Sequence, residues 1–227
     1  MWEKCENMEN KVIFKDLENA GVVPVVVLED VSCALPLAKA LKDGGIYCVE
    51  ITFRTNAAAA SIRAIANAYP EMLVGAGTVL TAAQAAEAIK AGAKFIVTPG
   101  YSREVVDYCI KQNFPVIPGC MDTYTIQLAL AAGIKVIKFF PAEAAGGIKM
   151  LKALSAPYKM IKFMPTGGIN ENNIRDYLSL DNVIACGGSW IAESELIARK
   201  AYDEITLRAK NAVICVCDAR KKRECDG

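Results

Sequence analysis

The chain alternates short apolar runs with longer segments in which apolar residues recur at helical spacing. Runs that are apolar on both faces and alternate with helices are typical of a parallel sheet. Eight runs predict strands, at 22–28, 46–52, 72–79, 94–98, 115–118, 135–140, 161–166 and 183–186. Eight segments predict helices, at 31–43, 57–68, 82–91, 103–112, 125–132, 148–154, 171–178 and 191–209.

Eight strand-plus-helix units indicate a closed (β/α)₈ barrel, the TIM barrel. An open doubly wound sheet remains the alternative, because periodicity does not reveal closure. No Gly/Ser-rich linker or change in composition divides the chain. We therefore expect residues 1–227 to form a single α/β domain with its core at about 17–209. A short helix would precede this core, and residues 218–227 would form a solvated tail.

Composition and charge exclude several classes of protein. The hydrophobic fraction of 53% is ample for a large core, and the balance of 26 basic against 25 acidic residues gives no sign of a nucleic-acid partner. No stretch approaches the roughly 20 apolar residues of a membrane span. The N-terminal segment carries charges throughout and lacks the apolar centre of a signal peptide. We expect a cytoplasmic protein without a membrane partner.

The cysteine and histidine counts narrow the chemistry. The nine cysteines are an odd number, and several lie singly in apolar runs, as buried thiols do. Histidine is absent, which removes histidine triads, the common zinc sites and histidine general bases. Any acid–base catalysis must therefore use other side chains or water. We expect neither a metal nor a cofactor.

Lys138 is the most informative residue, because it is the one amine in the apolar run Val136–Phe140. Burying an ammonium is costly, and a neutral lysine amine is a nucleophile towards carbonyl carbon. Schiff-base chemistry is therefore one hypothesis. The alternative is a lysine whose stem lies along the sheet while its head reaches water.

Glu50 is a second costly charge within a predicted strand. Period two places it on the same side of the strand as Cys48, Thr52 and Arg54. Glu50 and Lys138 would offset each other's burial as a pair, so a purely structural salt bridge stays open beside a catalytic role.

Gly-Gly turns follow the last two predicted strands. They occur in Thr166-Gly167-Gly168 and in Gly187-Gly188-Ser189. Such turns expose backbone N–H groups beside a helix, and in a barrel this is a common phosphate site. The pattern predicts a ligand that carries a phosphate.

Three lysines within predicted strands precede phenylalanine: Lys94, Lys138 and Lys162. Lys94 begins its run, so it should lie at the end of the barrel opposite the site. Lys138 and Lys162 both stand three residues before a proline, so spacing leaves two candidate nucleophiles.

Five motifs resemble those of the 2-keto-3-deoxy-6-phosphogluconate (KDPG) aldolases, also called 4-hydroxy-2-oxoglutarate (KHG) aldolases. They are Val49–Thr55 (VEITFRT), Gly75–Leu80 (GAGTVL), Lys138–Glu143 (KFFPAE), Pro165–Ile169 (PTGGI) and Gly187–Trp190 (GGSW). The resemblance covers about 17–209 and implies the TIM barrel. It also implies that Lys138 forms the Schiff base, which leaves Lys162 structural, and that Glu50 transfers protons.

The resemblance implies substrate contacts as well. Arg54 and Thr78 would hold the pyruvyl carboxylate, and the two Gly-Gly turns would accept the phosphate. The expected substrate-binding residues are Arg54, Thr78, Pro99, Phe140, Thr166, Gly167, Gly168, Gly187, Gly188 and Ser189.

The implied activity is a class I aldolase that reversibly cleaves KDPG to pyruvate and glyceraldehyde 3-phosphate, and KHG to pyruvate and glyoxylate. The implied assembly is a homotrimer. The alternatives are a phosphogalactonate aldolase of the same family, a phosphate-binding isomerase or epimerase, and a non-catalytic binding or assembly module. One departure affects the aldehyde end: the loop 119–125 (GCMDTYT) lacks the proline and glutamate of the T-P-[ST]-E-like sequence common in the family.

Overall fold

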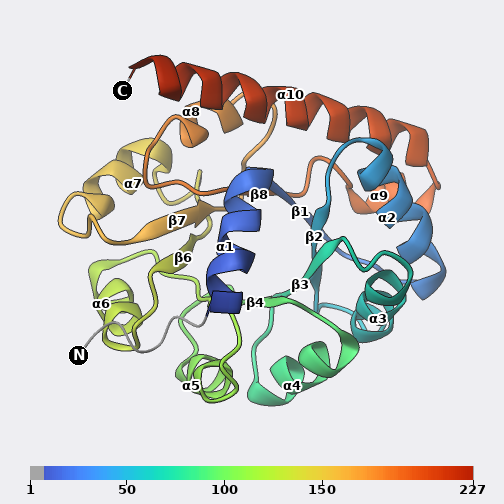
Figure 1. The fold of residues 1–227 in the computed structure, drawn as a ribbon, viewed down its shortest axis with the longest axis horizontal. Helices are drawn as coiled ribbons and strands as arrows, with labels where there is room; N and C mark the ends of the chain where they lie inside the picture. The colour runs from blue at the N-terminus through green and yellow to red at the C-terminus, as the bar shows by residue number, and fades with distance from the viewer. Residues whose placement is uncertain (1–7, 227) are drawn as a thin grey trace.

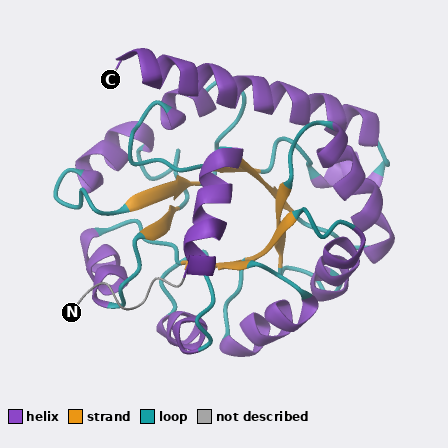
Figure 2. Cartoon of the chain, in the orientation of Figure 1, coloured by secondary structure: helices purple, strands orange, loops and turns teal. Residues whose placement is uncertain are grey.

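The computed structural model describes residues 8–226; the remainder of the expected 1–227 domain lies outside the described residues. Parallel strands lie inside a ring of helices, as Figures 1 and 2 show. The strands are β1 Val22–Val26, β2 Cys48–Thr52, β3 Leu73–Gly77, β4 Phe95–Val97, β5 Val116–Ile117, β6 Val136–Phe139, β7 Lys162–Pro165 and β8 Cys186–Gly188.

The helices follow the strands in alternation, as the sequence pattern predicts. They are α1 Met8–Ala20, α2 Ala34–Asp43, α3 Ala58–Ala68, α4 Ala82–Ala91, α5 Arg103–Lys111, α6 Thr123–Ala131, α7 Gly147–Ser155, α8 Ile174–Leu178, α9 Ser194–Ala198 and α10 Tyr202–Asp226, with a 3₁₀ turn η1 at Val31–Cys33.

All strand pairs are parallel, which confirms the α/β class. Six strands form a curved sheet in the order β5-β4-β3-β2-β1-β8, and β6 pairs separately with β7. Single bridges join the two sheets: Gly119 to Lys138 on one side, and Phe163 to Val183 and Thr166 to Gly187 on the other. The expected ladder of eight strands is therefore interrupted at two junctions.

The last strand begins later than the apolar run 183–186 predicts. Val183 makes only a single bridge, whereas the regular ladder with β1 begins where Cys186 pairs with Val22. The bounds of the strand are set by main-chain pairing. This pairing starts at the end of the apolar run and continues into the two glycines of β8.

Burial on both faces explains the apolar runs. Every residue of β2 and of β6 is buried, including Glu50 and Lys138. Glycine in β3 admits neighbouring side chains, since a Cβ at Gly75 would lie 2.2 Å from the Phe95 ring. This dense packing holds residues of the strands in fixed positions.

Helix α4 shows how local sequence sets the boundaries of an element. The Thr81 hydroxyl accepts a hydrogen bond from Gln84 N at 3.2 Å, which caps the N-terminus. Gly92 ends the helix with a φ of 101°, the left-handed conformation expected at this position.

The expected helix 191–209 is two helices. Lys200 adopts a φ of 55°, and the N–H groups of Lys200 and Ala201 bond back to Ile197 and Leu196. This is the Schellman arrangement that ends α9. It is formed without a glycine, so the sequence carried no stop signal.

The expected tail also differs. Residues 218–226 continue α10 as helix. Ala219 is buried, and Asp218 pairs with Arg175 at 3.1 Å, so α10 packs against the body through this region. Figure 1 shows α10 running along one side of the molecule, past α8 and α2.

Helix α1 crosses one end of the strands in Figure 1. Leu17 of this helix is fully buried and joins the main hydrophobic core. The opposite end, where the strands have their C-termini, is left for the loops that carry the motifs.

Candidate active site

Lys138 is the third residue of β6 and is 4% exposed. Both main-chain polar groups of Lys138 bond to the chain after β5: Lys138 N donates to Pro118 O at 2.9 Å, and Cys120 N donates to Lys138 O at 2.8 Å. The amine is therefore presented from a rigid strand near its C-terminal end.

Glu50, the third residue of β2, meets that amine. Its Oε1 lies 3.3 Å from Lys138 Nζ, and the Glu50 side chain is fully buried. Gly77 of β3 makes this position possible, because a Cβ there would lie 2.0 Å from Glu50 Oε1. Three strands thus cooperate to bring one carboxylate to one amine.

The second carboxylate oxygen distinguishes this pair from an ordinary buried salt bridge. Glu50 Oε2 is buried and has no hydrogen-bond partner among the described residues. A buried pair that serves only stability is expected to have both oxygens satisfied, since an unpaired buried acceptor is costly. Glu50 Oε2 is an acceptor available to a substrate proton.

The strand register separates the two candidate lysines. Lys162 is the first residue of β7 and pairs with Val136, whereas Lys138 pairs with Met164 two residues further on. Lys162 Nζ donates to Asp181 O at 2.9 Å in an exposed position. Lys94 precedes β4 and is exposed. Lys138 alone of these three is buried beside a carboxylate.

Arg54 and Thr78 lie together, as the motifs predict. Arg54 Nε donates to Thr78 Oγ1 at 3.3 Å. Thr78 has a φ of 52°, a rare conformation for a β-branched residue and one often found at functional sites. The arrangement places a guanidinium fork at the rim of β2 and β3.

A cavity of about 290 Å³ has neither Lys138 nor Glu50 in its lining, and Phe140 links it to Lys138. Phe140 lines it, and the Phe140 ring centroid lies 5.4 Å from Lys138 Nζ. Residues from several loops form its walls, including Arg54, Thr166, Gly167, Gly168, Gly187 and Ser189. Gly167 and Gly168 adopt φ values of 96° and 79°, so glycine is required at both.

Three expected binding residues, Thr78, Pro99 and Gly188, do not line this cavity. Gly188 is adjacent to the Trp190 ring, which lies 1.6 Å from where a Cβ would stand, so the described contacts give it a packing role. Pro99 is half-buried after β4, and its carbonyl packs against Gly119.

Some cavity residues were missed by the sequence analysis. Val25 of β1, and Glu193 and Ser194 at the start of α9, also line the cavity. Arg208 of α10 neutralises Glu193, with Nη1 at 2.8 Å from Oε2. No motif marked these positions, because their placement depends on how β1 and α10 pack.

The unusual loop 119–125 retains a helix cap. Asp122 Oδ1 accepts from Thr125 N at 2.8 Å and begins α6, while Cys120 is buried. Met121 and Tyr124 are exposed. The loop is therefore fixed next to Lys138 by buried Cys120 and by the Asp122 cap, and its exposed side chains are Met121 and Tyr124.

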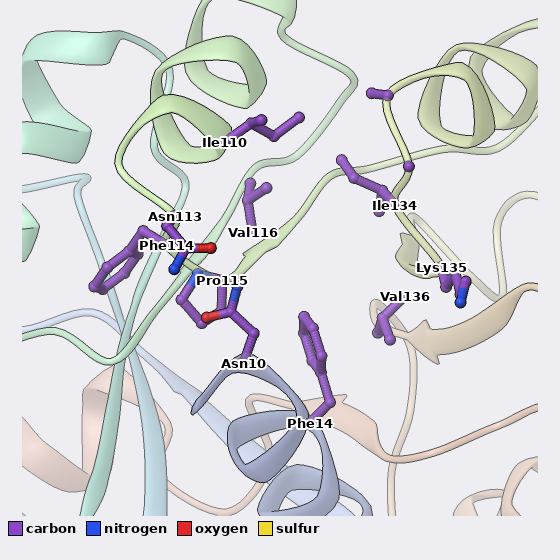
Figure 3. A pocket seen from close by; sticks show the side chains of 12 residues that line it. Asn10, Phe14, Ile110, Asn113, Phe114, Pro115, Val116, Ile134, Lys135 and Val136 are labelled. Atoms are coloured by element: carbon purple, nitrogen blue, oxygen red, sulfur yellow. The ribbon is translucent and has the colours of Figure 1, made fainter. Parts of the chain in front are cut away.

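A second cavity, of about 170 Å³, lies at the other end of the strands. Figure 3 shows Asn10 and Phe14 of α1 facing Phe114, Pro115 and Val136 across it. Lys135 is its one charged residue among those described. It holds no counterpart of the Lys138–Glu50 pair.

Within residues 8–226, no group of three or more cysteine, aspartate and glutamate side chains is placed to hold a metal ion. The same part of the chain has no helix long and apolar enough to cross a membrane.

Residues 13–208 match the family model described as KDPG and KHG aldolase. The chain belongs to this family. Among its relatives in the KDPG and KHG aldolase family is the 2-dehydro-3-deoxy-phosphogluconate aldolase of Haemophilus influenzae, 48% identical over 85% of this chain and 91% of that protein. The KHG/KDPG aldolase of Escherichia coli is 44% identical over 87% of this chain and 92% of its own length.

A solved structure of the family is similar along nearly its whole length. The KDPG aldolase of Legionella pneumophila, with pyruvate captured as a covalent carbinolamine intermediate, has a TM-score of 0.84 and 41% identity, covering 90% of this chain and 97% of that one.

Proposed function

We propose that this protein is a Schiff-base aldolase that reversibly cleaves KDPG to pyruvate and glyceraldehyde 3-phosphate. The observation that carries the proposal is the buried Lys138–Glu50 pair, which Phe140 links to a cavity walled by two Gly-Gly turns. The pair supplies a nucleophile and a base, and the turns supply backbone N–H groups for a phosphate.

The reaction begins at Lys138. Lys138 passes a proton of its ammonium to Glu50, and the amine adds to the C2 ketone of the substrate. The proton then returns to the carbinolamine hydroxyl, which leaves as water and gives an iminium that withdraws electrons from C3. Arg54 can bind the carboxylate at C1 bidentately and so orient the ketone. Thr78, bonded to Arg54, fixes the direction of the guanidinium.

Glu50 then accepts the proton of the C4 hydroxyl, directly or through one water. The C3–C4 bond breaks, its electron pair forms the enamine, and the aldehyde leaves. Protonation of C3 and hydrolysis of the iminium release pyruvate and restore the Lys138 amine. Because Lys138 itself forms the covalent bond, this scheme needs neither a metal nor a cofactor.

The other half of the substrate would lie towards Thr166–Gly168 and Gly187–Ser189. Both turns line the cavity into which Phe140 leads from Lys138. We propose the phosphorylated acid as the main substrate and KHG as a second one. The Escherichia coli relative carries both names.

Borohydride trapping tests the nucleophile. With pyruvate present, reduction should add one pyruvate-derived mass to the peptide that contains Lys138. Lys162→Ala is the matched control and should still be labelled at Lys138. A label on Lys162, or none on any lysine, would contradict the proposal.

An aldol-cleavage panel tests the substrate. It should compare KDPG, its galactonate epimer, the unphosphorylated acid 2-keto-3-deoxygluconate and KHG. We expect KDPG to have the highest kcat/KM. A preference for the galactonate epimer would point to the alternative aldolase of this family, and the absence of any cleavage would point to a binding module.

We also propose that the chain is one domain whose two sheets act together as a closed (β/α)₈ barrel. The bridges at Lys138, Val183 and Thr166 support this, as does the continuous hydrophobic core.

For assembly and location, we propose a homotrimer in the cytoplasm. Leu80, Met121 and Tyr124 are exposed on the loops after β3 and β5, where they could contribute to a subunit contact. The cysteines that the structure describes are free thiols, as is usual in a reducing compartment. Light scattering of the purified protein should give three times the chain mass.

A further inference from the structure

Glu143 and Tyr177 form a hydrogen bond that the mechanism does not use. Tyr177 of α8 donates from its hydroxyl to Glu143 Oε1, across 34 positions of sequence. The Tyr177 side chain is fully buried, whereas Glu143 lies at the surface, in the segment between β6 and α7. Neither residue lines the cavity walled by the two Gly-Gly turns.

The Glu143 main chain is attached to the expected phosphate turn. Ala142 N donates to Thr166 O at 2.8 Å, and Glu143 N donates to Gly167 O at 3.1 Å. These bonds extend the pairing of β6 with β7 beyond the ends of both strands. The segment that carries Lys138 is thereby joined directly to the turn after β7.

The Glu143 side chain lies across the same turn. A Cβ at Gly168 would lie 2.6 Å from both Glu143 Cβ and Glu143 Cγ. Gly168 has a φ of 79°, so the turn depends on glycine for its backbone shape and for this contact. The Glu143 stem therefore packs against one of the two residues whose N–H groups would face the phosphate.

Tyr177 fixes the far end of that side chain. A surface glutamate normally samples several rotamers, but a hydrogen bond to an ionised acceptor from a buried ring restrains it. Gly147, near the start of α7, packs closely on the pair: a Cβ there would lie 3.1 Å from Glu143 Oε1 and 3.3 Å from Tyr177 Oη. Three segments of the chain thus converge on one hydrogen bond.

We infer that Glu143 and Tyr177 are positioning residues that hold the Gly167–Gly168 turn at a set distance from Lys138, and so favour phosphorylated over unphosphorylated 2-keto acids. This inference rests on the proposed function, because it assumes that the phosphate binds at this turn. The pair acts on the turn from outside the cavity, through packing and main-chain bonds, without touching the substrate.

Tyr177→Phe tests the inference, since it removes one hydroxyl and keeps the ring. We expect kcat/KM for KDPG to fall about tenfold, chiefly through a higher KM, which is the scale of losing one hydrogen bond to a charged group. The kcat/KM for 2-keto-3-deoxygluconate and the trapping of pyruvate on Lys138 should stay unchanged. Tyr158→Phe is the matched control, because the Tyr158 hydroxyl accepts a hydrogen bond from Gln127 Nε2 and not from the turn or from Glu143.

Substitutions of Glu143 test the inference independently, because they leave the buried Tyr177 ring intact. Glu143→Ala should reproduce the KM effect, whereas Glu143→Gln keeps an acceptor oxygen for Tyr177 and should restore most of the preference for KDPG. Thermal unfolding of each variant identifies any that has lost its fold. Because Glu143 lies at the surface, we expect its variants to fold normally.

Equal losses for both substrates, or no loss for KDPG in either Tyr177→Phe or Glu143→Ala, would overturn the inference. Failure of the proposed function looks different: the wild type itself would show no preference for KDPG, or no imine at Lys138.

Discussion

Glu50 Oε1 lies 3.3 Å from Lys138 Nζ, although the two residues are 88 positions apart. Both side chains are buried, so the ion pair is protected from solvent screening. Since Glu50 Oε2 remains unpartnered within the described residues, the pair is held together without using the whole carboxylate. This arrangement is the one that the proposed mechanism requires, with Glu50 as the base and Lys138 as the nucleophile.

Replacing Glu50 by Gln should separate proton transfer from imine formation. The amide cannot accept the substrate proton, so exchange of pyruvate methyl protons should slow by about 10²- to 10⁴-fold. Borohydride trapping on Lys138 should persist. Exchange can be followed by NMR in heavy water, with Glu71→Gln as the control, because Glu71 pairs with Lys42 at the surface. Exchange at the wild-type rate would remove Glu50 from the mechanism.

Gly77→Ala should disable the site, although Gly77 is not itself a proposed catalytic residue. The new methyl group would occupy the position of Glu50 Oε1, only 2.0 Å away, and would push the carboxylate from Lys138. We expect at least a tenfold loss of kcat, because misplaced catalytic groups cost about 10²-fold. Gly100→Ala is the matched control, since nothing lies within 4 Å of its Cβ position. Equal activity of both variants would contradict the predicted role of Gly77.

Arg54→Lys should weaken binding of the substrate carboxylate. Lysine keeps the charge but loses the planar fork, so the KM for pyruvate in the exchange reaction should rise about tenfold while trapped Lys138 is still found at saturation. Arg103→Lys controls for the substitution, because Arg103 forms an exposed ion pair with Asp107 on the surface of α5. An unchanged KM would place the carboxylate elsewhere.

The buried thiols should resist alkylation. Burial raises the pKa of Cys48, Cys109 and Cys120 to about 12, which leaves about 10⁻⁴ of each as thiolate near pH 8. Iodoacetamide should therefore label exposed Cys217 in the native protein and spare these three. Peptide mass mapping checks this, with denatured protein as the control. Rapid labelling of Cys120 would mean that the loop beside Lys138 opens.

The same pKa shifts make the free energy of unfolding depend on pH in the alkaline range. A folded-state pKa above the unfolded value of about 8.5 means that the folded protein favours the neutral thiol. The stabilisation is complete below about pH 8.5 and is lost as the pH rises towards about 12. Urea denaturation at increasing pH should show a falling free energy of unfolding, and Cys48→Ala should reduce the pH slope. A stability that does not change over this interval would contradict the burial of these thiols.

Local sequence was enough to predict the α/β class, the number of units and most element positions. Each helix and strand has its own periodicity, and caps such as Thr81 and Gly92 act within one turn. Prediction failed where a local signal was missing or where packing between distant segments decided the element. The turn at Lys200 lacks a glycine, and residues 218–226 are helical because α10 packs against the body.

The sequence by itself determined which chemistry was possible: an amine and a carboxylate in apolar strands, no histidine, and two Gly-Gly turns. Spacing could not choose between Lys138 and Lys162, since both stand three residues before a proline, and the choice of Lys138 came from the resemblance. Only the tertiary structure decided their surroundings, because the register of β6 against β7 puts Lys162 at the start of its strand and Lys138 two residues deeper, next to Glu50. Register depends on main-chain pairing between segments far apart in sequence, and no local pattern specifies it.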